Sequence, residues 1–328
     1  MTERNLSLVE AAVIESNLGT MRGMRDALVQ SGIRKVHPFQ SLAGMTDALA
    51  ALQPDLIVAD VDSPEMDGFK LIRWLRTDLG YPNPFVCILA TSWQPTEALL
   101  HKVHNSGADL LLVKPASPKQ MTERIHALLE NRKRFTVSAD YIGPDRRKNP
   151  REGQQVPSLD APNTLRLKAT GHWDRLTVRD DLAKGIAWLN EQKAQRDAFQ
   201  IAFYIEVAKP GLAAAPPERM AFELILKVSP LIEDLLKRTE ATECDPGLDT
   251  ACRAVLALVE RVRRRAGAKI AETDIGELQA LSASLMRMVN PGRQPESMSE
   301  EVAEAAAAYQ KRLEQILAAR AEAAKPGP

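Results

Sequence analysis

The sequence predicts a doubly wound α/β domain with a five-stranded parallel sheet, followed by an arginine-rich linker and an all-α C-terminal domain. Over residues 1–133, short apolar runs alternate with amphipathic stretches, which is the pattern of strands and helices in a parallel sheet. Over 134–175, Gly, Pro, Asn and Arg replace that periodicity, as in a linker. From 176 to 328 the apolar spacing is helical and no strand pattern interrupts it.

The first segment contains five strand and helix pairs in alternation. Its strands are expected at 8–14, 36–39, 55–62, 85–91 and 109–115. The third of these, DLIVADVD, is almost entirely apolar, which is typical of a strand that helices bury on both faces. Helices are expected at 21–30, 41–52, 69–79, 96–107 and 117–132, and Ser41 and Ser117 are candidate N-caps.

The C-terminal segment is expected to be helical to its end. Leu182, Ile186 and Leu189 recur at helical spacing, and the stretch 298–324 is rich in Ala and Glu with Ser299 as a candidate cap. Its narrow apolar stripe is compatible with pairing against another helix, including that of a second copy in a homodimer.

Composition limits the classes of partner. The 328 residues are enough for two domains, and 43 Lys and Arg balance 43 Asp and Glu. With no net charge, nucleic acid and anionic membranes are not expected partners. Three cysteines without metal-type spacing fit a reducing compartment, with Cys87 a buried thiol. The sequence contains no signal peptide pattern and no long apolar span, so we expect a cytoplasmic protein.

Polar side chains stand where the predicted strands end. Strand one is followed by Glu15 and Ser16, strand three ends at Asp60, strand four at Thr91 and strand five at Lys114. In a doubly wound sheet, ligands bind beyond the carboxyl ends of the strands. These residues are therefore the candidate site.

Three blocks in the same order resemble the receiver domains of two-component response regulators. They are DLIVADVDSPEMDGFKLIRWLR, ILATS and GADLLLVKP, and the resemblance covers about residues 5–133 and none of the remainder. It implies that Asp60 accepts a phosphoryl group from a histidine kinase or a phosphotransfer protein. It also implies that the chain is no enzyme beyond self-catalysed phosphotransfer and autodephosphorylation.

The resemblance assigns roles to the other strand ends. Lys114 offsets the charge of the phosphoryl oxygens, and the Thr91 hydroxyl bonds one of them and moves inward. The backbone carbonyl of Asp62 contributes to a Mg²⁺ site, while the Asp62 side chain faces the attacking water. Trp93 matches the second position that modulates dephosphorylation.

Two positions depart from the family pattern. Family members place two adjacent acids after strand one, whereas this chain has Glu15 and Ser16. Mg²⁺ is therefore expected to bind weakly to Glu15, Asp60 and the Asp62 carbonyl, with Ser16 or Asn17 holding a water in place of the missing acid. The second departure is Leu111, where many receivers have an aromatic switch residue, so signalling through such a switch is not expected.

The linker concentrates positive charge at Arg146, Arg147 and Arg151. The R-x-x-x-R spacing of Arg147 and Arg151 resembles the arginine pair of PilZ domains, which bind cyclic-di-GMP, but the companion D/N-x-S-x-x-G motif is absent. A nucleotide site, a solvated tail that packs on the receiver and a protein-docking segment remain open.

The leading interpretation is a response regulator that is phosphorylated on Asp60 and acts through contacts with an unknown partner protein. One alternative is a degenerate receiver that works as a phosphorylation-independent adaptor. The other is an effector that binds a nucleotide through the arginine-rich linker.

Overall fold

A computed structural model of the chain describes residues 4–41, 45–147, 157–240, 247–265 and 268–323. Its contacts divide the chain into two units, Met1–Leu189 and Asn190–Pro328. The boundary lies inside one long helix, well beyond the end of the predicted receiver at residue 133.

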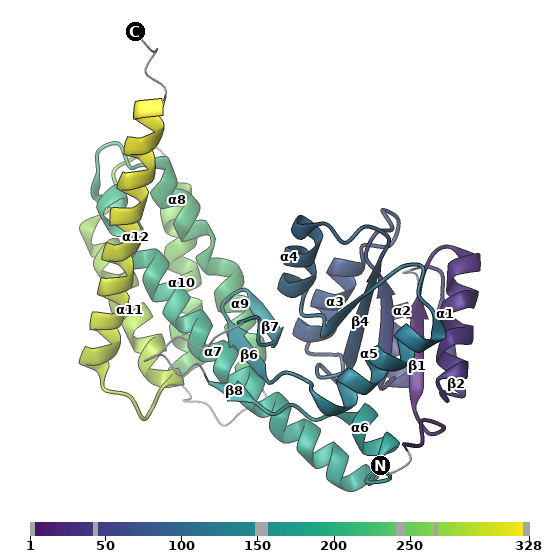
Figure 1. Cartoon of the computed structure of the whole chain (residues 1–328). Helices are drawn as coiled ribbons and strands as arrows, with labels where there is room; N and C mark the ends of the chain where they lie inside the picture. The colour runs from purple at the N-terminus through teal and green to yellow at the C-terminus, as the bar shows by residue number, and fades with distance from the viewer. Residues whose placement is uncertain (1–3, 42–44, 148–156, 241–246, 266–267, 324–328) are drawn as a thin grey trace. The chain divides into compact units, whose positions relative to one another are not determined.

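The first unit contains the predicted five-stranded parallel sheet (Figure 1). The strand order is β2-β1-β3-β4-β5, with every neighbouring pair parallel. The strands are β1 (Glu10–Ile14), β2 (Lys35–Phe39), β3 (Leu56–Asp60), β4 (Cys87–Ser92) and β5 (Leu110–Val113). The helices between and after them are α1 (Leu18–Gln30), α2 (Met45–Leu52), α3 (Gly68–Thr77), α4 (Glu97–Ser106) and α5 (Pro118–Glu130). The doubly wound fold is thereby confirmed.

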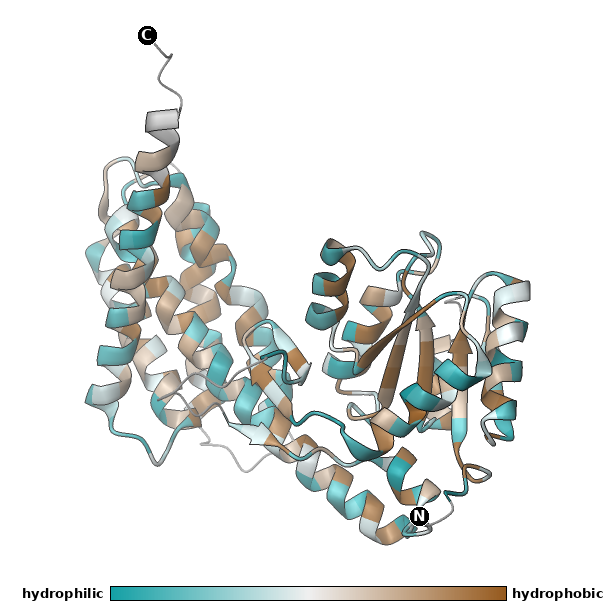
Figure 2. Ribbon diagram, viewed as in Figure 1, coloured by the Kyte–Doolittle hydropathy of each residue, from teal (hydrophilic) through white to brown (hydrophobic). Residues whose placement is uncertain are grey.

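Helices bury both faces of this sheet, which explains the continuous apolar strands. Ala11 and Val13 of β1 pack with α1 and α5, whereas the alternate residues Ala12 and Ile14 pack with α2, α3 and α4. Figure 2 shows the hydrophobic residues gathered along the strands. Burial raises the pKa of Cys87 on β4 to about 12, so it is the buried thiol that the sequence indicated.

The segment predicted to be a linker is partly folded. It contains β6 (Phe135–Ser138), β7 (Tyr141–Pro144) and β8 (Ser158–Leu159), which form an antiparallel sheet in the order β7-β6-β8, and then α6 (Thr164–Ala169). We call residues 135–169 the extension. Its strands are only two to four residues long, too short for the alternation that identifies a strand, and this is why the sequence suggested a linker.

A buried charged cluster joins the extension to the amino-terminal edge of the receiver sheet. Asp109 bonds Arg76 Nη2 at 2.9 Å and Arg132 Nε at 2.7 Å. Both guanidinium carbons lie 5.0 Å from the centroid of the Phe135 ring. Phe135 also packs against Phe85 with ring centroids 5.4 Å apart. The extension is therefore an integral part of the first unit.

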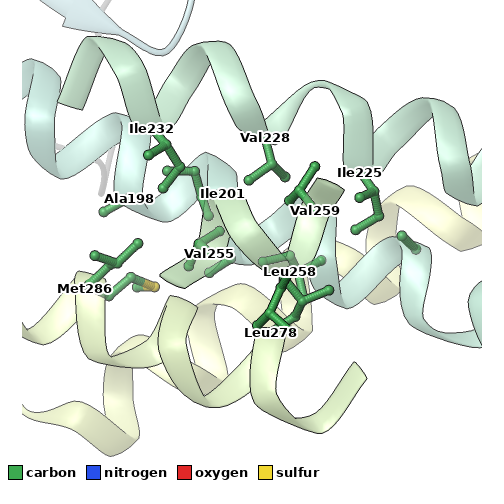
Figure 3. Close-up of a cluster of buried hydrophobic side chains, with 14 of the residues drawn as sticks. Ala198, Ile201, Ile225, Val228, Ile232, Val255, Leu258, Val259, Leu278 and Met286 are labelled. Carbon is green, nitrogen blue, oxygen red and sulfur yellow. The ribbon is translucent and has the colours of Figure 1, made fainter. Parts of the chain in front are cut away.

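The second unit is helical throughout its described residues, as predicted. It comprises the second half of α7 (Arg175–Ala213), then α8 (Arg219–Leu226), α9 (Val228–Thr239), α10 (Gly247–Arg264), α11 (Glu272–Val289) and α12 (Pro295–Ala323). Its core is one cluster of aliphatic side chains, including Ile201, Ile232, Val255 and Leu278 (Figure 3). Within the described residues, no helix is long and apolar enough to span a bilayer.

One predicted helix start differs from the observed one, and the start predicted at Ser41 adjoins residues outside the described ranges. The last helix begins at Pro295, and the hydroxyl of Ser299 donates to the Pro295 carbonyl inside it, so Ser299 is not its cap. Proline at a first helical position is favourable because its missing N–H has no partner there in any case. Helix α2 is described from Met45, and Ser41 is separated from it by residues outside the described ranges. Ser117 does cap α5 in a capping box with Gln120.

Candidate functional site

The carboxyl ends of β1, β3, β4 and β5 bring the predicted site residues together. The parallel register pairs Ile14 with Ala59 and Asp60 with Thr91, so the side chains that end these strands meet at one edge. Glu15, Asp60 and Thr91 are 2%, 3% and 0% exposed. These polar groups are thus buried in the protein at the end of an apolar sheet.

Lys114 is the centre of this site. Its ammonium group donates to Asp60 Oδ1 at 2.7 Å and to Glu15 Oε2 at 3.0 Å, and its side chain is itself buried. The Lys114–Pro115 peptide bond is cis. One buried cation therefore supplies the opposite charge for two buried carboxylates.

Two groups of the site are not saturated with hydrogen bonds. Asp60 Oδ1 accepts from Lys114 and from the Asp62 backbone N–H at 3.1 Å, whereas Oδ2 accepts no hydrogen bond from the described residues. The buried Thr91 hydroxyl likewise has no partner in the described part of the chain. A buried hydroxyl without a partner is costly, which suggests that it serves a second state.

Gly68 allows the loop after β3 to fold back over Asp60. A Cβ atom at Gly68 would lie 2.0 Å from the Asp60 carbonyl oxygen, closer than any real contact. Asp67 caps α3 by accepting from the Lys70 N–H at 3.0 Å, which fixes where the helix begins. The structure thus explains the Asp67–Gly68 pair of the first receiver-like block: Asp67 caps α3, and Gly68 leaves room for the Asp60 carbonyl.

The acid-poor end of β1 leaves few ligands for a metal. No group of three or more His, Cys, Asp or Glu side chains in the described ranges could hold a metal ion. The Ser16 hydroxyl lies 3.3 Å from the Ser63 hydroxyl, and both oxygens of Glu15 accept hydrogen bonds, from Lys114 and from the Asn17 N–H. The oxygen donors are nevertheless of the kind that a hard divalent cation prefers.

The Asp62 carboxylate binds the last residue of β4 and the first residue of the loop that follows. Its Oδ1 accepts from the Ser92 hydroxyl at 2.7 Å and its Oδ2 from the Trp93 N–H at 2.6 Å. The Trp93 ring is half exposed, and Lys114 Nζ lies 5.2 Å from its centroid. Motif spacing placed Asp62 and Trp93 near the site, but it contained no sign of the bonds between them.

Leu111, at the position where many receivers carry an aromatic switch residue, is partly buried and packs against the core formed with α2, α3 and α4. Its side chain is aliphatic, so this position has no ring that could turn inward.

The arginines of the predicted anion site are only partly described. The Arg146 guanidinium stacks 3.9 Å from the centroid of the Tyr141 ring and donates to Asn105. Arg147 is exposed and lies 4.0 Å from Asp145. Arg151 lies outside the described residues, so its pairing with Arg147 stays a prediction.

Sequence reasoning did not single out Ser63 at this edge of the sheet or Arg76 at the opposite edge. The Ser63 hydroxyl lies 3.3 Å from that of Ser16, and buried Arg76 binds the carbonyls of Gly107, Pro84 and Val86 in addition to Asp109. For Arg76, the only signal in the sequence was a charged residue on the apolar face of the helix predicted at 69–79.

Residues 11–126 match the family model of the response regulator receiver domain. The first unit contains a receiver domain. The match spans the five-stranded sheet except for Glu10 and ends inside α5, so it leaves the extension and the helical unit unassigned.

Curated relatives resemble this receiver domain over similar lengths. The DNA-binding response regulator MtrA of Mycobacterium tuberculosis (strain ATCC 25618 / H37Rv) is 31% identical over 119 residues, which are 34% of this chain and 50% of MtrA. The polar-differentiation response regulator DivK of Brucella suis (strain ATCC 23445 / NCTC 10510) is 25% identical over 118 residues, 36% of this chain and 93% of DivK. The chain therefore spans about half the length of MtrA.

Solved receiver structures are also similar to this domain. The chemotaxis protein CheY4 of Vibrio cholerae aligns at 19% identity with a TM-score of 0.33, over 36% of this chain and 96% of CheY4. DrrB of Thermotoga maritima, described as an OmpR/PhoB homologue, aligns at 19% identity with a TM-score of 0.34, over 40% of this chain and 58% of DrrB.

Proposed function

We propose that the chain is a response regulator of a phosphorelay, in which a histidine kinase or a phosphotransfer protein phosphorylates Asp60. The observation that carries this proposal is the buried contact of Lys114 with Asp60 and Glu15, beside a Thr91 hydroxyl that has no partner among the described residues. We further propose that the chain is no enzyme beyond self-catalysed phosphotransfer and hydrolysis. Its output is a contact between the helical unit, the extension or the receiver surface and a partner protein.

The site residues suit the transfer of a phosphoryl group. A carboxylate oxygen of Asp60 attacks the phosphorus of a phosphohistidine, the P–O bond forms, and the P–N bond breaks to return the imidazole. Lys114 offsets the negative charge of the phosphoryl oxygens. The Thr91 hydroxyl has no partner among the described residues. It donates a hydrogen bond to one of the phosphoryl oxygens.

Mg²⁺ would add the remaining positive charge. The Glu15 and Asp60 carboxylates and the Asp62 carbonyl are the residues that would hold it, since all three supply oxygen donors near the acceptor. Lys114 already neutralises one of the two carboxylate charges. Because Ser16 contributes no charge, we expect a higher Mg²⁺ requirement than in a receiver with two adjacent acids.

Intact-mass measurement after incubation with acetyl phosphate and Mg²⁺ tests the proposal. The full chain should gain one phosphoryl group, and Asp60→Asn should gain none. Asp26→Asn is the matched control, because Asp26 is an exposed aspartate on α1 of the same unit. A gain that persists in Asp60→Asn would contradict the assignment.

A receiver that works as an adaptor without phosphorylation is the second candidate. The observation in its favour is the Ser16 contact with Ser63, in a site where the described residues offer no cluster of three metal-binding side chains. Absence of a mass gain at saturating Mg²⁺, with acetyl phosphate and with a cognate kinase, would favour the adaptor.

Nucleic acid is a further candidate partner, contrary to the expectation from net charge. MtrA is named a DNA-binding response regulator, and its similarity covers only the receiver domain of this chain. We retain output through protein contact as the proposal, and DNA binding by the full chain is its direct competitor.

A further inference from the structure

The bonds of Asp62 bear directly on how a signal could leave the phosphorylation site. Thr91, Ser92 and Trp93 are consecutive, and the last two donate their hydrogen bonds to the two oxygens of one carboxylate. The Ser92 hydroxyl also accepts from the Gln94 N–H at 3.1 Å. Asp62 therefore fixes the beginning of the segment 93–96, which leads from β4 into α4.

The same carboxylate lies two residues after the acceptor. Asp60 binds the Asp62 backbone N–H, so the two residues share one tight turn at the end of β3. Phosphorylation replaces the single charge of Asp60 by a group of about −2. Like charges brought together repel, and the added charge acts on Asp62 more strongly than on any neutral group of this turn.

We propose that Asp62 is a positioning residue that holds segment 93–96 in its unphosphorylated place, and that phosphorylation of Asp60 releases it. This inference rests on the proposed function and adds to it a way in which phosphorylation moves segment 93–96. Thr91 is drawn to the phosphoryl group while the carboxylate that holds Ser92 and Trp93 is repelled. Both effects act on one short stretch of chain, and they favour the same change.

The proposal adds a role for the Asp62 side chain beside the one implied by the resemblance. Its two oxygens accept hydrogen bonds from Ser92, the last residue of β4, and from Trp93, the first residue of the loop that follows. Trp93 reports the release, because its N–H is the donor to Asp62 and its ring lies against Lys114.

Hydrogen–deuterium exchange of the Trp93 amide in the full chain, followed by NMR, tests this inference. In the absence of phosphodonor, Asp62→Ala should exchange this amide about tenfold faster than the unmodified protein, because it loses hydrogen bonds to a charged acceptor. Asp62→Asn, which keeps the shape and loses the charge, should lie between them. Adding beryllium fluoride and Mg²⁺ to the unmodified protein should accelerate exchange in the same direction.

Glu65→Ala is the matched control, since Glu65 is an exposed acid of the same loop whose carboxylate makes no hydrogen bond to the described residues. Equal Trp93 exchange in Asp62→Ala and Glu65→Ala would overturn the proposal. Faster exchange in Asp62→Ala without any effect of beryllium fluoride would overturn its phosphorylation step. If acetyl phosphate adds no mass to Asp60, the proposed function fails, whereas the exchange of Asp62→Ala still measures the hold of Asp62 on the loop.

Discussion

At the scale of single residues, the site depends on close contacts as much as on charge. Gly68 stands against the Asp60 carbonyl, where a side chain would have to displace the end of β3. Lys114 holds its two carboxylates only if that strand end keeps its place. The glycine thus belongs to the geometry of the acceptor although it has no chemistry of its own.

We predict that Gly68→Ala lowers the free energy of unfolding by about 1–3 kcal/mol, as overpacked sites do, and slows phosphorylation of Asp60. Gly23→Ala on α1 is the control, since a Cβ there meets nothing within 4 Å. That substitution should stabilise the helix by about 0.5–1 kcal/mol. Urea unfolding and the initial rate of mass gain measure both effects, and equal behaviour of the two variants would contradict the steric argument.

Asp197 is a buried carboxylate in the core of the helical unit. It is fully buried on α7, bonded to Lys193, and its Oδ2 has no partner in the described ranges. Lys193 also lies 3.1 Å from Asp234, which binds Arg238 on α9 at 3.0 Å. Burial is the main cause that raises the pKa of Asp197 to about 7. The nearby Lys193 lowers this pKa, and the negative charge of Asp234 raises it further.

This pKa predicts a pH dependence of stability with a definite sign. The folded protein keeps the Asp197 proton up to about pH 7, whereas the unfolded chain releases it near the ordinary aspartate pKa of 3.8. The folded state therefore binds more protons between these values, and this contribution to stability falls as pH rises through them. Above about pH 7 the loss is complete, on the order of 4 kcal/mol.

Urea unfolding of the full chain at pH 5 and pH 8, followed by far-UV circular dichroism, measures this dependence. Asp197→Asn should remove most of the decline between the two pH values, while Glu233→Gln, at an exposed position on α9, should leave it unchanged. A decline of the same size in Asp197→Asn would assign it to other groups.

At the scale of elements, the extension completes the receiver's amino-terminal edge. Phe135 of β6 contacts Phe85 and both guanidinium groups of the Asp109 cluster. Leu182 and Ile186 of α7 pack against the same small core, and Gly185 is close enough to Phe85 that a Cβ would lie 2.8 Å away. A receiver cut at residue 133 would expose this core.

We predict that a fragment of residues 1–133 is less stable than one of residues 1–189 by about 3 kcal/mol or more, the usual cost of losing a buried aromatic. Phe135→Ala in the full chain should cost about 3–5 kcal/mol, whereas Leu79→Ala, at a 43% exposed site in the same unit, should cost far less. Equal unfolding midpoints for the two fragments would show that the extension adds no stability.

At the scale of the whole molecule, charge balance is the feature that bears on partners. The chain has no net charge. The arginines near the end of α10 form ion pairs within the helical unit: Arg261 and Arg265 pair with Asp274, and Arg263 and Arg264 pair with Glu260. This pairing reduces the local positive potential that a phosphate backbone would meet.

We predict weak binding of the full chain to random duplex DNA, with little change between about 50 and 200 mM salt. Fluorescence anisotropy with a labelled duplex measures this, before and after treatment with acetyl phosphate. Strong retention with a steep salt dependence would contradict the expectation from charge and favour DNA as the output partner.

The sequence by itself determined the receiver domain and its candidate residues. Strand runs that are apolar on both faces predicted the parallel sheet, and residues following those runs had to meet at its carboxyl edge, so Glu15, Asp60, Thr91 and Lys114 could be assembled without coordinates. Helical periodicity likewise predicted the class of the second unit. These features repeat along the chain or follow from topology.

Only the tertiary structure decided what depends on particular contacts between distant residues. The extension has strands too short to show a period, and Phe135 became a core residue because Arg76, Phe85 and Arg132 surround it. In the same way, Asp62 has the residue type that the motif led us to expect, but its partners lie at the end of another strand and just beyond it, 30 and 31 residues away. Local patterns report local preferences, whereas such contacts exist only once the chain has folded.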